Sequence, residues 1–142
     1  MDATAAGPAA GRRRRVLAIH GGDGDEDPGV FPFQLLGFAV DSICTVQQAG
    51  GTLSGEELTA LVDGLDADGR LGAYTHVLSG WVGEVVLCRA VAAAVRRVRQ
   101  ANPSVVYVCD PVLGDNVSKY GELSIKNEEC VSKMMKFAGP AL

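Results

Sequence analysis

The feature that most constrains this chain is the alternation of short apolar runs with segments of helical periodicity. Apolar runs occupy residues 15–19, 38–46, 74–78 and 104–109, and residues typical of turns follow them. Such runs are typical of strands that are buried on both faces of a sheet. Because helical segments separate them, the order β-α-β-α-β-α-β predicts an α/β fold with a mostly parallel sheet covered by helices.

Three segments carry the helical signals. Residues 31–36 predict a short helix, with Pro32 in its first turn and Gly37 as its end. Ser54 and Glu57 form a capping box that opens a second helix. The apolar face that we expect on this helix consists of Leu58, Leu61, Val62 and Leu65.

The third helix has the clearest amphipathic pattern and covers residues 84–101. Its predicted apolar side consists of Leu87, Val91, Ala94, Val95 and Val98. Arginines crowd its last turns, where cations complement the helix dipole.

Charge and composition exclude several classes of protein. The chain has 142 residues, with 13 basic and 17 acidic side chains and a net charge of −4. This balance argues against a general nucleic-acid binder, which needs a basic face. No apolar run approaches the roughly 20 residues that span a bilayer. We therefore expect a cytoplasmic domain, or part of one, after a disordered basic tail over residues 1–14.

Cysteine and histidine usage argues against a zinc site. The four cysteines form no C-x-x-C pair, and the chain has only two histidines, His20 and His76. We interpret the cysteines as buried free thiols. His76 lies inside a predicted strand and is interpreted as a sheet histidine, whereas His20 lies at a strand end near the candidate site. The cysteines are Cys44, Cys88, Cys109 and Cys130.

The candidate chemistry lies at the carboxyl ends of the predicted strands, where parallel α/β sheets bind their ligands. Asp110 and Asp115 follow the last strand, five residues apart, around a proline and a glycine. Carboxylates of this kind suit Mg²⁺ that carries nucleotide phosphates. The alternative is an aspartate that caps the next helix or turn, and the spacing alone leaves both interpretations open.

Four segments of the chain carry a recognisable sequence pattern. Residues 107–115, YVCDPVLGD, follow a helix that ends in RQANP, and residues 15–19, 31–38 and 74–81 precede them in order. These segments resemble the pyridoxal kinases of the ribokinase-like superfamily: in chain order they are similar to the family's first strand, its FP-x-Q-x-LG segment, its Y-x-HVLTGY strand and its fairly specific CDPV-[LM]-GD segment. The resemblance implies a ribokinase-like (Rossmann-like) α/β domain over residues 15–115, truncated, with a divergent C-terminal tail over residues 116–142.

The resemblance also implies an activity and its ligands. It implies ATP-dependent phosphorylation of the 5′-hydroxymethyl group of pyridoxal, pyridoxine or pyridoxamine, the salvage of vitamin B6 to pyridoxal 5′-phosphate (PLP). By family position, Asp110 and Asp115 serve Mg²⁺ and the ATP phosphates, and Gly21 and Trp81 lie on the substrate side. Trp81 stands where the family usually has a tyrosine. The resemblance also suggests a monovalent cation as a second cofactor and a homodimer as the assembly, and the sequence leaves both open.

Three departures from the family pattern bear on catalysis. Gly21 stands where the family has a serine that touches the pyridine ring, and residues 45–52 lack the family's Asn-His-Thr contacts. Nothing in residues 116–142 resembles the G-T-G-D motif, which supplies the catalytic aspartate and the anion hole. We therefore assign no catalytic residue and predict absent or very weak turnover by this chain. The alternative is a non-catalytic α/β binding or dimerisation domain derived from the kinase.

Overall fold

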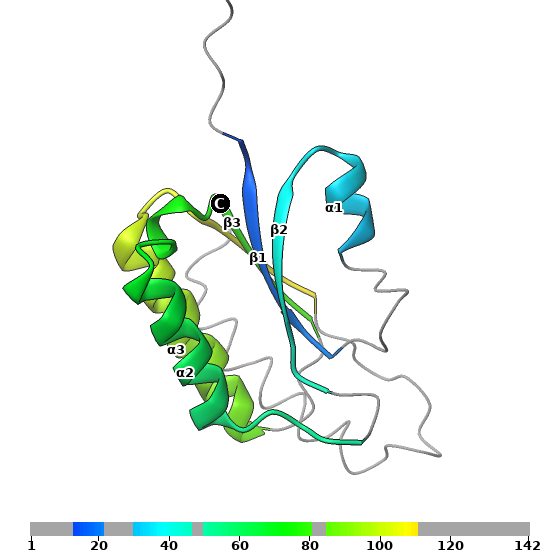
Figure 1. The fold of residues 1–142 in the computed structure, drawn as a ribbon, viewed down its shortest axis with the longest axis vertical. Helices are drawn as coiled ribbons and strands as arrows, with labels where there is room; N and C mark the ends of the chain where they lie inside the picture. The colour runs from blue at the N-terminus through cyan, green and yellow to red at the C-terminus, as the bar shows by residue number, and fades with distance from the viewer. Residues whose placement is uncertain (1–12, 22–29, 47–49, 81–84, 111–142) are drawn as a thin grey trace, which may run out of the picture.

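The computed structural model describes residues 13–21, 30–46, 50–80 and 85–110, which form a four-stranded parallel sheet with helices (Figure 1). The strand order is β2-β1-β3-β4, and every neighbouring pair is parallel. The strands are β1 (Arg15–His20), β2 (Ala39–Cys44), β3 (His76–Ser79) and β4 (Val106–Cys109). The helices are α1 (Phe31–Leu35), α2 (Gly55–Ala67), the short 3-10 helix η1 (Leu71–Ala73) and α3 (Val85–Ala101). The predicted order of strands and helices is confirmed.

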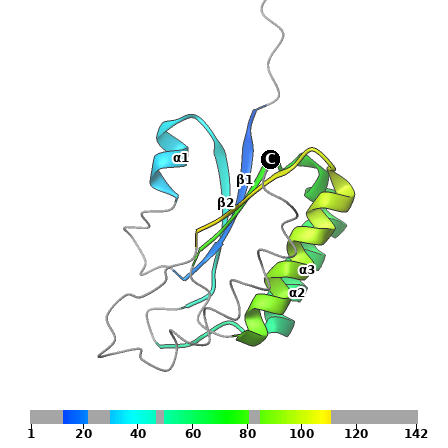
Figure 2. The same ribbon diagram turned by 180° about the vertical axis from the view of Figure 1, so that it is seen from behind.

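The described helices are distributed unequally over the sheet. The helices α2 and α3 lie side by side along one face, and the short helix α1 lies on the other side next to β2 (Figures 1 and 2). Gly37, just after α1, has a φ of 82°, a backbone conformation that glycine adopts without strain and that ends the helix. None of the helices within these ranges is both long and apolar enough to cross a membrane.

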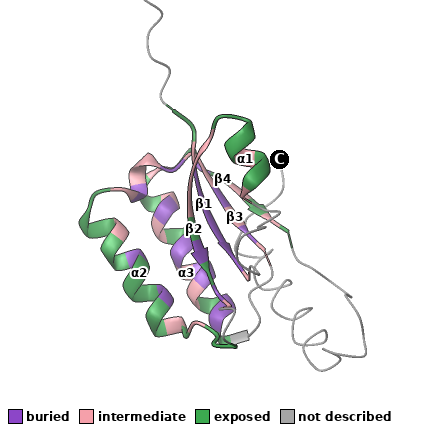
Figure 3. Cartoon of the chain, turned by 45° about the vertical axis from the view of Figure 1, so that its right-hand side comes forward, coloured by how far each residue is buried: buried purple, intermediate pink, exposed green. Residues whose placement is uncertain are grey.

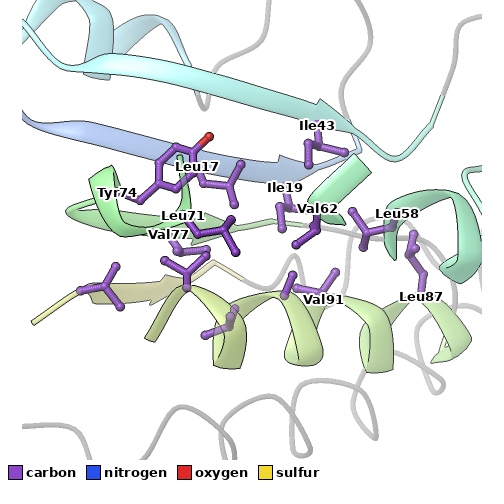
Figure 4. Packing of buried hydrophobic residues seen from close by; sticks show 14 of the residues in the cluster. Leu17, Ile19, Ile43, Leu58, Val62, Leu71, Tyr74, Val77, Leu87 and Val91 are labelled. Atoms are coloured by element: carbon purple, nitrogen blue, oxygen red, sulfur yellow. The ribbon is translucent and has the colours of Figure 1, made fainter. Parts of the chain in front are cut away.

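The hydrophobic core lies between the sheet and the pair α2 and α3 (Figure 4). Leu17 and Ile19 of β1 are fully buried in it, as are Leu58 of α2 and Val91 of α3. Burying one aliphatic side chain of this size stabilises a fold by about 1.5–3 kcal/mol. The apolar side predicted for α3 is confirmed, because all five of its residues are buried.

Two details of the helices differ in how well the sequence predicted them. The capping box of α2 is confirmed, since the Ser54 hydroxyl accepts from the Glu57 N–H at 3.1 Å and the Glu57 carboxylate accepts from the Ser54 N–H at 2.8 Å. Leu61, however, is 48% exposed, so its place on the buried face was predicted wrongly. It lies about 100° around the helix from the buried Val62, at the rim of the apolar stripe.

The strands β3 and β4 are shorter than predicted. Tyr74 precedes β3 as the C-cap of η1, and its side chain is buried at the amino end of the sheet. β4 is an edge strand of the described sheet (Figure 3). Its residues Val106 and Val108 are 50% and 43% exposed. The prediction of a strand buried on both faces is therefore wrong for β4, because an apolar run does not reveal whether a second layer covers it.

The cysteine prediction needs correction. Cys44 and Cys109 are free, but Cys44 is exposed rather than buried, and Cys109 is partly buried. Cys88 is disulfide-bonded, and its partner is neither of these two. Distance along the sequence does not predict which thiols meet in space, which is why the interpretation as free thiols failed for Cys88.

Candidate functional site

The carboxyl ends of the four parallel strands meet at one edge of the sheet. The register pairs His20 with Cys44, Ile19 with Ser79, and Ser79 with Cys109. We call the residues that directly follow the four strands the carboxyl edge; they are Gly21, Thr45, Gly80 and Asp110. The sheet thus brings together the predicted residues Gly21 and Asp110, whereas Trp81 and Asp115 lie outside the described residues.

Asp110 is held by its backbone and presents an exposed side chain. Its N–H donates to the carbonyl of Ser79 at 2.8 Å, which continues the pairing of β3 with β4 by one residue. Within the described ranges, no hydrogen bond or ion pair engages its carboxylate, and it is exposed to solvent. An exposed carboxylate with unused oxygens is the ligand type that Mg²⁺ prefers, so this residue fits the predicted metal and phosphate side.

A buried hydroxyl pair lies directly behind this carboxylate. The Ser79 side chain is fully buried, and its hydroxyl is 2.7 Å from the hydroxyl of Tyr107 on the neighbouring strand. Burial raises the pKa of Tyr107 above its ordinary value, and the Cys109 thiol adds to this, so the phenol keeps its proton. Sequence reasoning missed this pair, although a tyrosine inside an apolar strand signals a hydroxyl that needs a buried partner.

Gly80 makes a close approach to the end of β1. A Cβ atom built on Gly80 would lie 3.0 Å from the Cβ of His20, which is tighter than nearly all such contacts. The Nε2 of His20 is 3.0 Å from the hydroxyl of Ser42, so the buried ring is directed toward the neighbouring strand β2. His20 is thus the last residue of β1 and is buried, whereas the sequence placed it just after the predicted strand over residues 15–19.

Thr45 carries the one buried side-chain oxygen in the described residues that lacks a hydrogen-bond partner. Its backbone is well tied, since its N–H donates to the His20 carbonyl and its carbonyl accepts from the N–H of Leu53, both at 2.8 Å. The residue is fully buried, so this hydroxyl is not accessible to a ligand in the described structure.

A second aspartate, Asp41, lies near the amino end of the sheet and is fully engaged. Arg15 donates to it at 3.0 Å, Arg70 at 2.8 and 2.9 Å, and the Tyr74 hydroxyl at 2.8 Å. Burial opposes its ionisation, but the hydrogen bonds of Tyr74 and Arg15 and the charge of Arg70 outweigh it and lower the pKa of Asp41. We call these four residues the amino-edge cluster. The cluster has a structural role, because both oxygens of the Asp41 carboxylate already accept hydrogen bonds.

Metal-binding geometry built from protein ligands alone is not found in the described ranges. No group of three or more histidine, cysteine, aspartate or glutamate side chains lies close enough there to hold an ion. Mg²⁺ commonly uses only one or two carboxylates together with phosphate oxygens.

Comparison with known proteins finds similar kinases, although no family model matches the chain. A pyridoxal kinase from Arabidopsis thaliana is 41% identical over 100 residues, which are 64% of this chain and 32% of that kinase. A pyridoxal kinase from Pseudomonas aeruginosa is 39% identical over 116 residues, which are 72% of this chain and 40% of that kinase.

Solved structures extend the match to the fold. A pyridoxal kinase from Leishmania donovani, in complex with ADP and pyridoxamine, superposes with a TM-score of 0.74 at 32% identity. The superposition covers 88% of this chain and 48% of that one. The chain thus spans less than half the length of these relatives, and each of them is a kinase, which does not favour a non-catalytic domain. Over the portion that it covers, which fits an N-terminal part, the chain belongs to the pyridoxal kinase family and has its ribokinase-like α/β fold.

Proposed function

We propose that the chain serves the ATP-dependent phosphorylation of the 5′-hydroxymethyl group of a pyridoxal-type vitamer. The observation that carries the proposal is the convergence of Gly21, Gly80 and Asp110 at the carboxyl edge of a parallel sheet. Ligands of open parallel sheets bind at this edge. The related Leishmania donovani structure is a complex with ADP and pyridoxamine, which supports both ligand classes.

Asp110 forms the phosphate side of the proposed site. Its backbone is fixed by the bond to the Ser79 carbonyl, while its carboxylate stays exposed and able to bind. Mg²⁺ bound with the nucleotide would neutralise phosphate charge there. Asp115 follows five residues later and supplies a second carboxylate in this proposal.

Gly21 and Gly80 form the vitamer side. Neither residue has a side chain, so in this proposal a flat ring contacts the backbone at the ends of β1 and β3. Trp81 directly follows Gly80 and would stack on the pyridine through its indole. It is also the only tryptophan in the chain, which makes its fluorescence a specific reporter of this side of the site.

Binding is the property to test first. We expect pyridoxal to quench the fluorescence of Trp81, and MgADP to bind with an affinity that Asp110→Asn lowers by about 10-fold or more, since hydrogen bonds and charge pairs at one carboxylate are worth that much. The matched control is Asp68→Asn, which alters an exposed aspartate at the end of α2, far along the chain from the site. Equal MgADP affinity in the wild type and in Asp110→Asn would overturn the placement of the phosphate side.

Turnover is the second test. We expect PLP formation from pyridoxal and MgATP to be absent or very weak, because no G-T-G-D segment is present in the 142 residues. Loss of a general base and of oxyanion donors costs several orders of magnitude in rate. The assay compares the purified chain with a mock preparation. PLP formation at the rate of ordinary family members would contradict this expectation while supporting the reaction itself.

A further inference from the structure

The strand that carries Asp110 is the shorter of the two edge strands of the described sheet, with four residues against six in β2. β4 pairs with β3 on one side only, and Val106 and Val108 on one of its faces are half exposed. An edge strand pairs with a neighbour on one side only, so fewer hydrogen bonds fix its register than fix that of a central strand. Since Asp110 is the first residue after β4, any slip of this strand along β3 would displace its carboxylate.

Ser79 joins β3 to β4 by its side chain and by its backbone. Its hydroxyl bonds the hydroxyl of Tyr107 at 2.7 Å, and its carbonyl accepts from the N–H of Asp110 at 2.8 Å. The two bonds reach β4 three residues apart, on either side of Cys109, the register partner of Ser79. A slip of β4 by even one residue would break both bonds together.

The hydroxyl pair contributes register rather than simple burial. The ring of Tyr107 packs against the core and would do so equally as phenylalanine, whereas the hydroxyl contacts Ser79. Both hydroxyls lie on the side of the sheet that α2 and α3 cover, where an unpaired hydroxyl is costly. The Tyr107 hydroxyl also bonds the Cys109 thiol on its own strand, but its bond to Ser79 is the one that joins the two strands and favours one register.

We propose that Tyr107 is a positioning residue for the phosphate side of the site: through Ser79, its hydroxyl holds the end of β4 in the register that places Asp110. This inference rests on the proposed role of Asp110 in binding MgATP. Tyr107 does not touch the ligand, and its effect reaches the nucleotide only through the placement of that carboxylate. The prediction is therefore specific to the Mg²⁺-dependent part of nucleotide binding.

The test titrates Mg²⁺ at a fixed ADP concentration and follows binding to the full chain. We expect Tyr107→Phe to raise the Mg²⁺ concentration at half-saturation by about 3- to 10-fold, the effect of one hydrogen bond, with little change in the binding of metal-free ADP. Ser79→Ala should give the same shift. The double variant should give no further shift, because both substitutions remove one shared bond.

Tyr74→Phe is the matched control. It also removes one hydroxyl from a buried tyrosine, but at the amino-edge cluster, where the hydroxyl donates to Asp41. We expect this variant to lower the Tm and to leave the Mg²⁺ titration unchanged. A merely structural role for Tyr107 predicts the same behaviour for both tyrosine variants, and that result would overturn the inference.

The remaining outcomes separate this inference from the proposed function. If Asp110→Asn abolishes the Mg²⁺ dependence while Tyr107→Phe and Ser79→Ala bind as the wild type does, the inference is wrong and the proposed function stands. If the folded wild-type chain binds ADP without any response to Mg²⁺, the proposed role of Asp110 is wrong and the inference loses its basis. Additive shifts in the double variant would also overturn the shared bond.

Discussion

The two ends of the sheet use aspartate in opposite ways. At the amino end, Asp41 accepts hydrogen bonds from Arg15, Arg70 and Tyr74, all at 3.0 Å or less. At the carboxyl edge, Asp110 is fixed only through its backbone N–H, and its carboxylate is exposed. The Asp41 carboxylate stabilises the fold, whereas Asp110 is held by its backbone and its carboxylate has no hydrogen-bond partner among the described residues.

This difference shows that residues at one end of the sheet stabilise the fold, while a residue at the other end is available to bind a ligand. Neutralising a partly buried carboxylate with arginine side chains stabilises the fold but leaves no oxygen for a ligand. An exposed carboxylate contributes little to stability, yet it keeps its oxygens free for a cation. We therefore expect substitutions at the two ends to separate cleanly into effects on unfolding and effects on nucleotide binding.

The largest effect on stability is expected from Asp41→Ala. Removing this carboxylate leaves Arg15, Arg70 and the Tyr74 hydroxyl without their shared acceptor, which should lower the free energy of unfolding by about 2–3 kcal/mol. Asp110→Ala should change it by no more than about 0.5 kcal/mol, as is usual for exposed positions. Urea unfolding of both variants measures this pair. Equal losses would contradict the division of roles between the two ends.

An intermediate effect is expected from Gly80→Ala at the carboxyl edge. The added methyl group would lie 3.0 Å from the Cβ of His20, so β1 and β3 must shift apart slightly, at a cost of about 1–2 kcal/mol. Unlike Asp41→Ala, this variant should also weaken the quenching of Trp81 fluorescence by pyridoxal. Gly64→Ala, at an open position on α2, is the matched control and should affect neither property adversely. Unchanged stability and unchanged quenching in Gly80→Ala would show that the close approach is not required.

The smallest effect is the dependence of stability on pH. The pKa of Asp41 is lowered in the folded chain, so its contribution to stability is complete above its ordinary value of 3.8 and is lost as the pH falls through the folded pKa. Below about pH 4, the wild type should therefore lose stability more steeply than Asp41→Asn. The pKa of Glu57 is also lowered, but it contributes equally to both proteins and cancels in the difference. Parallel curves of unfolding free energy against pH would argue against the amino-edge cluster.

Several elements of the fold were predictable because their signals are local. The apolar run at β1, the capping box of α2 and the apolar side of α3 each depend on residues within one or two turns of each other. Their energies, from capping and from burial of one face, are set by spacing along the chain. The alternation of these elements also predicted the parallel sheet, since parallel strands need crossover helices.

The details that failed all depend on distant contacts. Leu61 and β4 were predicted as buried because they are apolar, but burial depends on what other layers cover them. Tyr74 looked like part of a strand, but it ends η1, and both of its polar contacts beyond η1, to Asn102 and Asp41, come from far along the chain. Cys88 was interpreted as free, although it is disulfide-bonded.

By itself, the sequence determined the order of the strands and main helices, the start of α2, the bounds of α1 and α3 to within one residue, and the candidates Gly21, Trp81, Asp110 and Asp115. Of these, the described structure reaches Gly21 and Asp110, and only the sheet register decided that they share one edge. Only the tertiary structure decided that both oxygens of Asp41 accept hydrogen bonds from two arginines and a tyrosine, while Asp110 stays exposed. The physical reason is that local spacing determines periodicity and capping, whereas the charge state and availability of a side chain depend on groups that folding brings to it from far along the chain.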